Sequence, residues 1–261
     1  SNYQIVQRTM TWVGLDNFAR FFRSAQFWDI LSNTVVLSLE SLVLGFFPPI
    51  ILALILNQVE NEKFKKFVQG VTYAPHFIST VVMCSIVLLF ITSGKNGMLN
   101  NFRQALGATD RIDFIAKPNY FANIYVWSGI WQSMGYSSII YIAALSGIDP
   151  SLHEAAVVDG ASKLRRVWHI DLPGIIPTIT ILLILNVGSL MNIGYEKVLL
   201  LQNDLNMSAS DIIATYVYRQ GLENAQYSFS AAVGLFNSVV NTILLVTVNF
   251  ITKKLGETSL F

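Results

Sequence analysis

The chain has 261 residues, of which 53% are hydrophobic and 13% charged, and its formal net charge is +1. A soluble domain carries about 25% charged residues, so this composition excludes an ordinary soluble fold. The aromatic content of 12% excludes intrinsic disorder, and the near-neutral charge gives no reason to expect a nucleic-acid partner. The single cysteine excludes an internal disulfide and a multi-thiolate zinc site. An all-α integral membrane protein remains.

Five stretches are long and apolar enough to cross a bilayer, which takes about 20 residues. They cover residues 30–57, 68–92, 120–147, 174–202 and 228–252. Each contains small or polar residues, as expected of helices that pack closely on other helices. Pro48 and Pro49 predict a kink or a break in the first span. The fold class is therefore a bundle of about five transmembrane helices.

The connections between spans give further expectations. Two short amphipathic helices are predicted, one with Met98 and Phe102 on its apolar side and one that follows Ser210 and Asp211. Lys and Arg are denser on the side that holds residues 58–67, 149–173 and the C-terminus, which favours that side as cytoplasmic. The chain starts without methionine and without a signal peptide, so we expect that it is truncated or processed at its start.

Residues 149–173 are too polar to cross the membrane and predict a helix-turn-helix elbow on its surface. Asp149 is placed to cap a helix that starts at Pro150, and Gly160 is placed to end it in a left-handed conformation. Leu172 and Pro173 are expected to end the second short helix and to start the next span. The apolar side of that second helix consists of Leu164, Val167, Trp168 and Ile170. Such an elbow can dock into a groove of a soluble partner.

Within this elbow, Glu-Ala-Ala is followed after three residues by Gly, and after nine more by Ile-x-Leu-Pro. The pattern is similar to the EAA loop of ABC importer permeases, and its fixed positions are Glu154, Ala155, Ala156, Gly160, Ile170, Leu172 and Pro173. The whole chain resembles binding-protein-dependent permeases of the maltose type, on residues 12–18, 33–34, 73–75 and 143–145. Residues 227–234 and the tail 255–261 resemble the branch that serves polysaccharides and complex oligosaccharides. Such permeases have six spans here, so we expect one to precede Ser1.

The resemblance implies a permease subunit of an ATP-driven oligosaccharide importer, with one domain over residues 1–261 and a cytoplasmic coupling loop at 149–173. Its implied partners are a second permease subunit, two ATPase subunits, an extracytoplasmic sugar-binding protein and the lipid bilayer. ATP and magnesium would reside on the ATPases, so this chain would hold no cofactor and no metal and would have no catalytic residue. The implied location is the bacterial inner membrane, multi-pass, with the elbow and the C-terminus in the cytoplasm. The residues implied in coupling to the ATPase are Glu154, Ala155, Ala156, Asp159, Gly160, Leu172 and Pro173.

A path for sugar needs amides, hydroxyls and aromatic faces within an apolar span, and the third and fourth spans mix these types. By resemblance to a maltose-type permease with a defined sugar site, matching positions precede and follow the elbow, although the residue types agree only in part. The candidates for the substrate path are Trp131, Gln132, Ser133, Tyr136, Gly188, Ser189, Asn192, Tyr195 and Glu40. Hydrogen bonding between helices is the alternative role for the polar ones. An acid such as Glu40 within a span is a functional hypothesis by default, because it is costly there.

Two other classes stay open. An ion-coupled carrier for a small polar solute needs inverted repeats around intramembrane charges, and an intramembrane enzyme needs a nucleophile with a base or a set of metal ligands. Neither pattern is evident, and Gly94-Lys95 lacks the upstream glycine of a phosphate-binding loop. The charge of the substrate also stays open. Basic residues of the outer loops suit acidic oligosaccharides such as uronates, but the alternative is that they extend their charged ends to the membrane–water interface. These residues are Lys95, Arg103, Arg111, Lys117 and Arg219.

Overall fold

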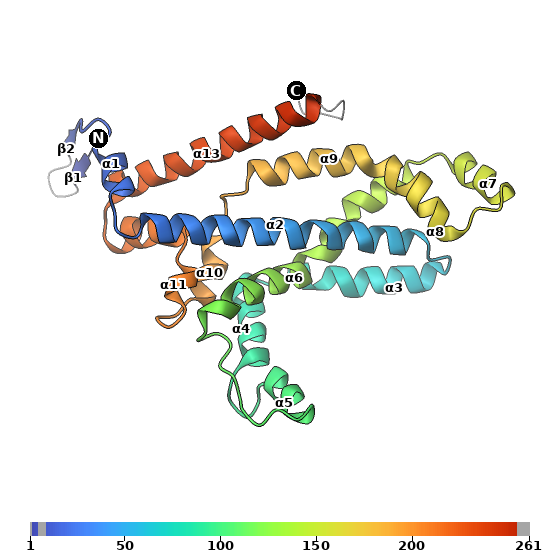
Figure 1. Cartoon of the computed structure of the whole chain (residues 1–261), viewed down its shortest axis with the longest axis horizontal. Helices are drawn as coiled ribbons and strands as arrows, with labels where there is room; N and C mark the ends of the chain where they lie inside the picture. The colour runs from blue at the N-terminus through green and yellow to red at the C-terminus, as the bar shows by residue number, and fades with distance from the viewer. Residues whose placement is uncertain (1, 5–8, 255–261) are drawn as a thin grey trace. The chain divides into compact units, whose positions relative to one another are not determined.

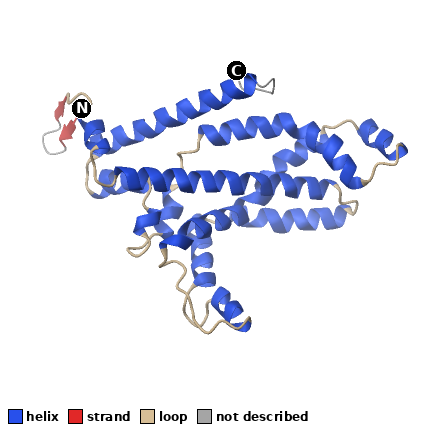
Figure 2. Ribbon diagram, viewed as in Figure 1, coloured by secondary structure: helices blue, strands red, loops and turns tan. Residues whose placement is uncertain are grey.

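The computed structural model describes residues 2–4 and 9–254, and this part is helical apart from one short ribbon (Figure 2). In the ribbon, β1 (Asn2–Gln4) pairs antiparallel with β2 (Thr9–Thr11). The predicted all-α membrane class is confirmed, and the short β-ribbon is a feature that the sequence analysis did not predict. The tail 255–261, used for the family resemblance, lies outside the described residues.

Contacts within the chain divide it into two compact units. The first unit comprises Ser1–Glu40, Thr80–Ser128 and Ser189–Ile243. The second comprises Ser41–Ser79, Gly129–Gly188 and Leu244–Phe261. Three long helices contribute residues to both units, and they are α2 (Phe27–Asn57), α6 (Pro118–Ser146) and α13 (Tyr227–Lys254) (Figure 1).

The remaining helices of the first unit are short. They are α1 (Asp16–Phe22), α4 (Thr80–Ile91), α5 (Met98–Ala105), α10 (Tyr195–Leu201), α11 (Met207–Ser210), α12 (Ile213–Tyr218) and η3 (Arg219–Glu223). The core of this unit forms around Phe21, which is fully buried and contacts the rings of Phe27, Tyr216 and Phe229. The predicted amphipathic helix with Met98 and Phe102 is confirmed as α5, and both of these side chains are exposed.

The second unit contains the elbow and the helices that carry it. These are α3 (Glu62–Tyr73), η1 (Ala74–Phe77), α7 (Pro150–Val158), α8 (Lys163–Arg166), η2 (Val167–Asp171) and α9 (Leu172–Gly188). Its core brings together side chains of α2, α6 and α9, namely Ile50, Ala53, Tyr141, Leu145 and Ile175. The three helices therefore pack on one another through apolar side chains, among them Leu145 near the end of α6 and Ile175 near the start of α9.

Three helices of the described residues are long and apolar enough to cross a membrane, and a fourth span results if two broken helices are counted together. The three are α2, the helix Lys163–Gly188 and α13, and the broken pair is Glu62–Phe77 with Thr80–Ile91. Helix α6 has 29 residues but is not among them. Its interior carries Ser128, Gln132, Ser133 and Ser137, which lower its hydropathy.

Two predicted spans are wrong as single helices. The stretch 68–92 breaks at Ile78 and Ser79, because Pro75 disrupts helical bonding and η1 ends in extended backbone at Ile78. The stretch 174–202 leaves the helix after Gly188 and resumes at Tyr195. In both cases the apolar run continues through the break, so composition alone does not reveal it.

Two further helix boundaries differ from expectation. Helix α2 continues through Pro48 and Pro49, so the predicted break is wrong, while the alternative of a kink stays a prediction. Packing of the following turn, in which Ala53 is fully buried, stabilises the helix beyond the prolines. The second helix of the elbow also does not end at Leu172, because α8, η2 and α9 follow one another without a gap. Pro173 therefore lies inside a continuous helix, directly after η2, and donates no backbone N–H to it.

Candidate functional site

The first helix of the elbow is capped as the sequence predicts. The Asp149 carboxylate accepts a hydrogen bond from the backbone N–H of Ser151 at 2.9 Å, and Pro150 occupies the first helical position. This bond stabilises the charged form, so the pKa of Asp149 lies below its ordinary value. Helix α7 has no buried residue, and most of its side chains are exposed and available to a partner.

Gly160 ends this helix in the predicted left-handed conformation, with φ +74°. A Cβ atom at this position would meet nothing within 4 Å, so the backbone conformation and not the available space favours glycine. Of the other residues implied in coupling, Glu154, Ala155, Asp159 and Pro173 are exposed, while Ala156 and Leu172 are half-buried. All of them belong to the second unit.

The elbow exposes apolar side chains. Those that are more than half exposed are Leu152, Val157, Val158, Leu164 and Trp168. Val158 reaches 87% exposure, which costs free energy unless another surface covers it. Exposed apolar residues on α7, α8 and η2, with the exposed Glu154 and Lys163 among them in the sequence, are typical of a docking surface.

A buried carboxylate anchors the elbow to the rest of the unit. Asp171, the last residue of η2, is fully buried. Its Oδ2 atom accepts a hydrogen bond from Gln58 at 2.7 Å, and its Oδ1 atom accepts one from Asn57 at 3.3 Å. The Nε2 atom of His153 on α7 lies 3.3 Å from the same Oδ1. The sequence analysis missed this cluster, for which the available signal was an acidic residue directly before an apolar span.

A second, exposed contact joins the same two regions. The Lys163 ammonium lies 2.5 Å from the Glu60 carboxylate and holds the pKa of Glu60 below its ordinary value. Both side chains are largely exposed, so this pair contributes little stability. It places the basic segment 58–67 beside the basic elbow.

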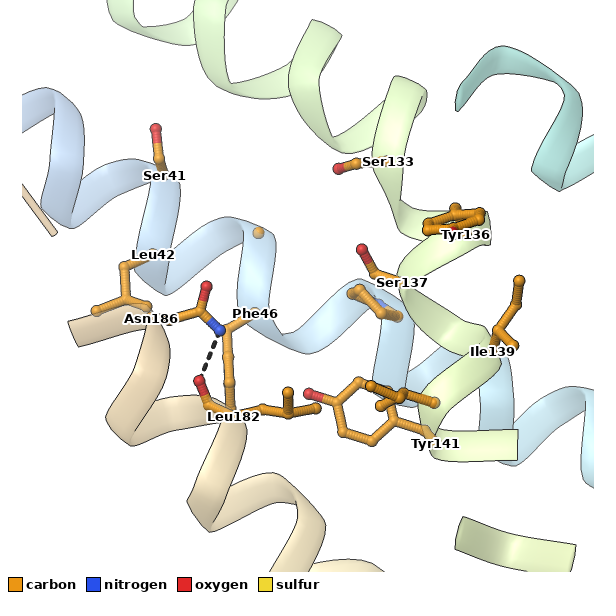
Figure 3. A pocket seen from close by; sticks show the side chains of 13 residues that line it. Ser41, Leu42, Phe46, Ser133, Tyr136, Ser137, Ile139, Tyr141, Leu182 and Asn186 are labelled. Carbon is orange, nitrogen blue, oxygen red and sulfur yellow. Dashed lines mark hydrogen bonds between the residues drawn. The ribbon is translucent and has the colours of Figure 1, made fainter. Parts of the chain in front are cut away.

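A cavity of about 520 Å³ lies between α2, α6 and α9 (Figure 3). Its lining mixes apolar side chains with the hydroxyls of Ser41, Ser133 and Ser137 and with the amide of Asn186. Asn186 donates to the carbonyl of Leu182 in its own helix, as the dashed line in Figure 3 shows. Among the residues that the structure describes, no Lys, Arg, Asp or Glu lines the cavity, so its chemistry is that of hydroxyl, amide and aromatic contacts.

Two of the predicted substrate-path residues, Ser133 and Tyr136, line this cavity. The ring of Tyr136 stacks on His76 of η1, with 3.9 Å between the ring centroids and an interplanar angle of 3°. Gln132 instead donates to the carbonyl of Ile78 at 3.0 Å and supports the break after η1. Trp131 is 42% exposed and does not line the cavity.

The candidates after the elbow lie outside the cavity. Gly188 packs against α13, where a Cβ atom would come within 2.5 Å of Leu245. In the first unit, Asn192 accepts hydrogen bonds from Asn237 and Asn241, and Tyr195 stacks on Tyr218. Ser189 is exposed in the turn that follows α9, and Glu40 is half-buried on α2. Their roles in a substrate path stay predictions.

Three of the five basic residues of the outer loops hold loop structure. Arg103 pairs with Asp110 at 3.3 Å, and Arg219 pairs with Asp211 at 2.5 Å. The Arg111 guanidinium donates to the carbonyls of Ser93 and Gly94 and to the side chains of Asn101 and Gln104. These cations are engaged within their own loops, which weakens the argument that they attract an acidic substrate. In the part of the chain that the structure describes, no three His, Cys, Asp or Glu side chains are grouped to hold a metal ion.

Comparison with known proteins gives a consistent result. Residues 49–257 match the family model described as "binding-protein-dependent transport system inner membrane component". Protein LplB of Bacillus subtilis (strain 168) is 42% identical over 250 residues, which is 96% of this chain and 78% of that protein. The polygalacturonan/rhamnogalacturonan transport system permease protein YteP of the same organism is also 42% identical, over 96% of this chain and 77% of its own length.

Solved structures agree with the relatives. A crystal structure of a bacterial ABC transporter involved in the import of the acidic polysaccharide alginate has a chain 39% identical to this one, with a TM-score of 0.89. The match covers 94% of this chain and 85% of the other. An amino acid ABC transporter at 14% identity and a TM-score of 0.53 shares the fold alone. The chain therefore belongs to the binding-protein-dependent transport system inner membrane components, the permease subunits of ABC transporters, and is a multi-pass transport component of the inner membrane and not an enzyme.

Proposed function

We propose that this permease imports oligosaccharides that an extracytoplasmic binding protein delivers, and that partner ATPases drive it through the elbow 149–173. In this proposal the whole chain works as one permease domain beside a second permease subunit. The observation that carries the proposal is the cavity between α2, α6 and α9, which lies in the same unit as the elbow and offers hydroxyls, an amide and a tyrosine. These are the groups that hydrogen-bond and stack on sugars.

The relatives point to acidic sugar chains. YteP is named for polygalacturonan and rhamnogalacturonan, and two matched structures are of alginate transporters, one in complex with an alginate-bound periplasmic protein. We therefore propose uronate-containing oligosaccharides as the first substrate class to test. Because no charged side chain lines the cavity, we expect it to recognise the hydroxyls of the sugar, with carboxylate recognition left to the binding protein or the second permease.

The elbow provides the proposed route to ATP. Glu154 is exposed on α7, where it is available to orient the elbow or to pair with a basic residue of an ATPase, while Ala155 and Ala156 permit close approach. The Glu60–Lys163 contact supports a cytoplasmic elbow, because it joins two short basic segments on one side and such segments favour the cytoplasm. When the ATPase subunits close on bound ATP, they would move the elbow. The elbow would then move the spans, so that the substrate path opens to one side of the membrane at a time.

The test is ATP-dependent uptake into proteoliposomes that contain this chain, the second permease, the ATPases and the binding protein. Neutral and uronic oligosaccharides of equal length are compared, with substrate-stimulated ATP hydrolysis measured in parallel. We expect stimulation by uronic oligosaccharides and its loss in a Glu154→Lys, Gly160→Leu double variant. Stimulation that the double variant leaves unchanged would contradict the coupling role. Uptake without ATP would instead favour an ion-coupled carrier.

The cavity needs its own variants. Ser137→Val replaces a hydroxyl in the lining by a methyl group and adds a second methyl group, and we expect it to lower uptake of the stimulating sugar. Ser146→Val is the matched control, because Ser146 ends the same helix, donates to Ile142 within it and does not line the cavity. Equal uptake by the two variants would show that the sugar does not pass this cavity.

A further inference from the structure

The contact between His153 and Asp171 joins the first helix of the elbow, α7, to the residue of the elbow from which α9 continues. Asp171 ends η2 at the start of α9, His153 lies on α7, and Asn57 and Gln58 lie at the C-terminal end of α2. The Asp171 carboxylate thus receives groups from two other parts of the chain, the end of α2 and α7, at distances of 2.7 to 3.3 Å. A buried carboxylate costs free energy without such partners. Loss of one partner therefore destabilises the whole group of contacts around Asp171.

Helix α7 has little else to hold it. None of its residues is buried, and its large side chains Leu152, Val157 and Val158 are more than half exposed. His153 is the exception, because its side chain is 26% exposed and turns to the fully buried Asp171. The exposed Glu60–Lys163 pair fixes α8 and not α7, and pairs of that kind are weak.

From this arrangement we propose that the His153–Asp171 contact is the tie through which a displacement of α7 reaches the end of α2 and the start of α9. His153 is a positioning residue in this reading, which rests on the proposed function of the elbow. The imidazole nitrogen of His153 lies 3.3 Å from a carboxylate oxygen that is fully buried and held by Asn57 and Gln58, so a displacement of α7 acts directly on this fixed group. Without it, α7 still presents its apolar side chains to a partner but moves independently of the spans.

Two substitutions separate the polar contact with Asp171 from the bulk of the side chain. His153→Leu removes the donor, and His153→Gln retains an N–H donor at a similar reach. The control is Glu60→Gln, which breaks the exposed contact between α8 and the segment after α2 and leaves the His153–Asp171 contact in place. The assembled transporter in lipid, with its binding protein, is measured for the number of sugars imported per ATP hydrolysed.

We expect His153→Leu to lower this ratio about fivefold or more, the lower end of typical allosteric couplings. ATPase copurification should stay at the wild-type level, because the docking surface is intact. His153→Gln should restore most of the ratio, and Glu60→Gln should resemble wild type. An unchanged ratio in His153→Leu, an equal loss in His153→Gln, or loss of ATPase copurification in His153→Leu would each overturn the proposal.

Amide hydrogen exchange in α7 is read on the same samples and needs no transport. Faster exchange across α7 in His153→Leu, but not in His153→Gln, supports the tie even if the wild-type complex imports no oligosaccharide. In that case the proposed function fails and the tie stands. Equal exchange in wild type and in His153→Leu overturns the tie whatever the complex transports.

Discussion

Asn241 donates its side-chain amide to Oδ1 of Asn192, 2.9 Å away, and accepts the backbone N–H of Met191 at 3.0 Å. One side chain of α13 thereby satisfies two groups of the turn that follows α9. Asn237, one helical turn earlier, donates to the same Oδ1 at 3.0 Å. The turn that interrupts the fourth apolar stretch is therefore fixed by α13, and an asparagine implied in sugar binding has its carbonyl engaged within the protein.

Asn241→Leu is expected to destabilise this turn, because it leaves the N–H of Met191 without its partner in a buried place. The cost should be about 1–3 kcal/mol, the range for an unsatisfied buried group. Thermal unfolding of the purified complex in lipid measures it. Ser238→Ala on the same helix removes only a bond to the carbonyl of Gly234 and serves as the control. Equal midpoints for the two variants would contradict the anchoring role of Asn241.

Close approach of α3 and α6 depends on Gly135. A Cβ atom at this position would lie 2.0 Å from the backbone carbonyl oxygen of Thr72, so one of the helices must move to accept it. Gly135→Ala should cost about 1–3 kcal/mol through overpacking, and the midpoint of thermal unfolding checks this. Gly70→Ala is the control, since its Cβ atom would meet nothing within 4 Å and alanine favours the helix of α3. A destabilisation by Gly70→Ala as large as that by Gly135→Ala would refute the steric argument.

The left-handed backbone at Gly160 predicts that any residue with a Cβ atom strains the elbow. Gly160→Ala should cost about 1–2 kcal/mol in local stability, because the left-handed region brings Cβ close to the carbonyl oxygen. Gly160→Asn should cost less, since asparagine tolerates this region better. Hydrogen exchange of α7 amides reports both variants. Equal protection in wild type and in Gly160→Ala would show that the turn adapts without strain.

The cap of α7 gives a pH dependence with a defined sign. The pKa of Asp149 is lower in the folded chain than its ordinary value, so the cap stabilises α7 at neutral pH. This contribution is lost as the pH falls through the folded pKa, because the protonated side chain accepts the Ser151 N–H less strongly. We expect α7 amides to exchange faster on acidification below about pH 4, after correction for the intrinsic pH dependence of exchange. Asp149→Asn keeps a capping oxygen and should lack this response, and the same acid response in Asp149→Asn would assign it to another group.

The sequence by itself determined the membrane class, the position of the elbow and its local geometry. These features depend on residues close together in the chain, such as the cap at Asp149 and the left-handed Gly160, and local backbone chemistry places them. The family followed from the spacing of Glu154, Gly160 and Pro173, which is also local information, and the comparisons agree with it.

Only the tertiary structure decided where the apolar runs break and which polar side chains meet. The breaks after Phe77 and Gly188 are held by Gln132 and Asn241, which lie 54 and 50 residues away from their partners. The cavity and the cluster around Asp171 each join helices far apart in sequence. Hydropathy averages over neighbours in the chain. A hydrogen bond to a distant carbonyl, or to a buried carboxylate, depends instead on how the helices pack, so no local sequence pattern predicts it.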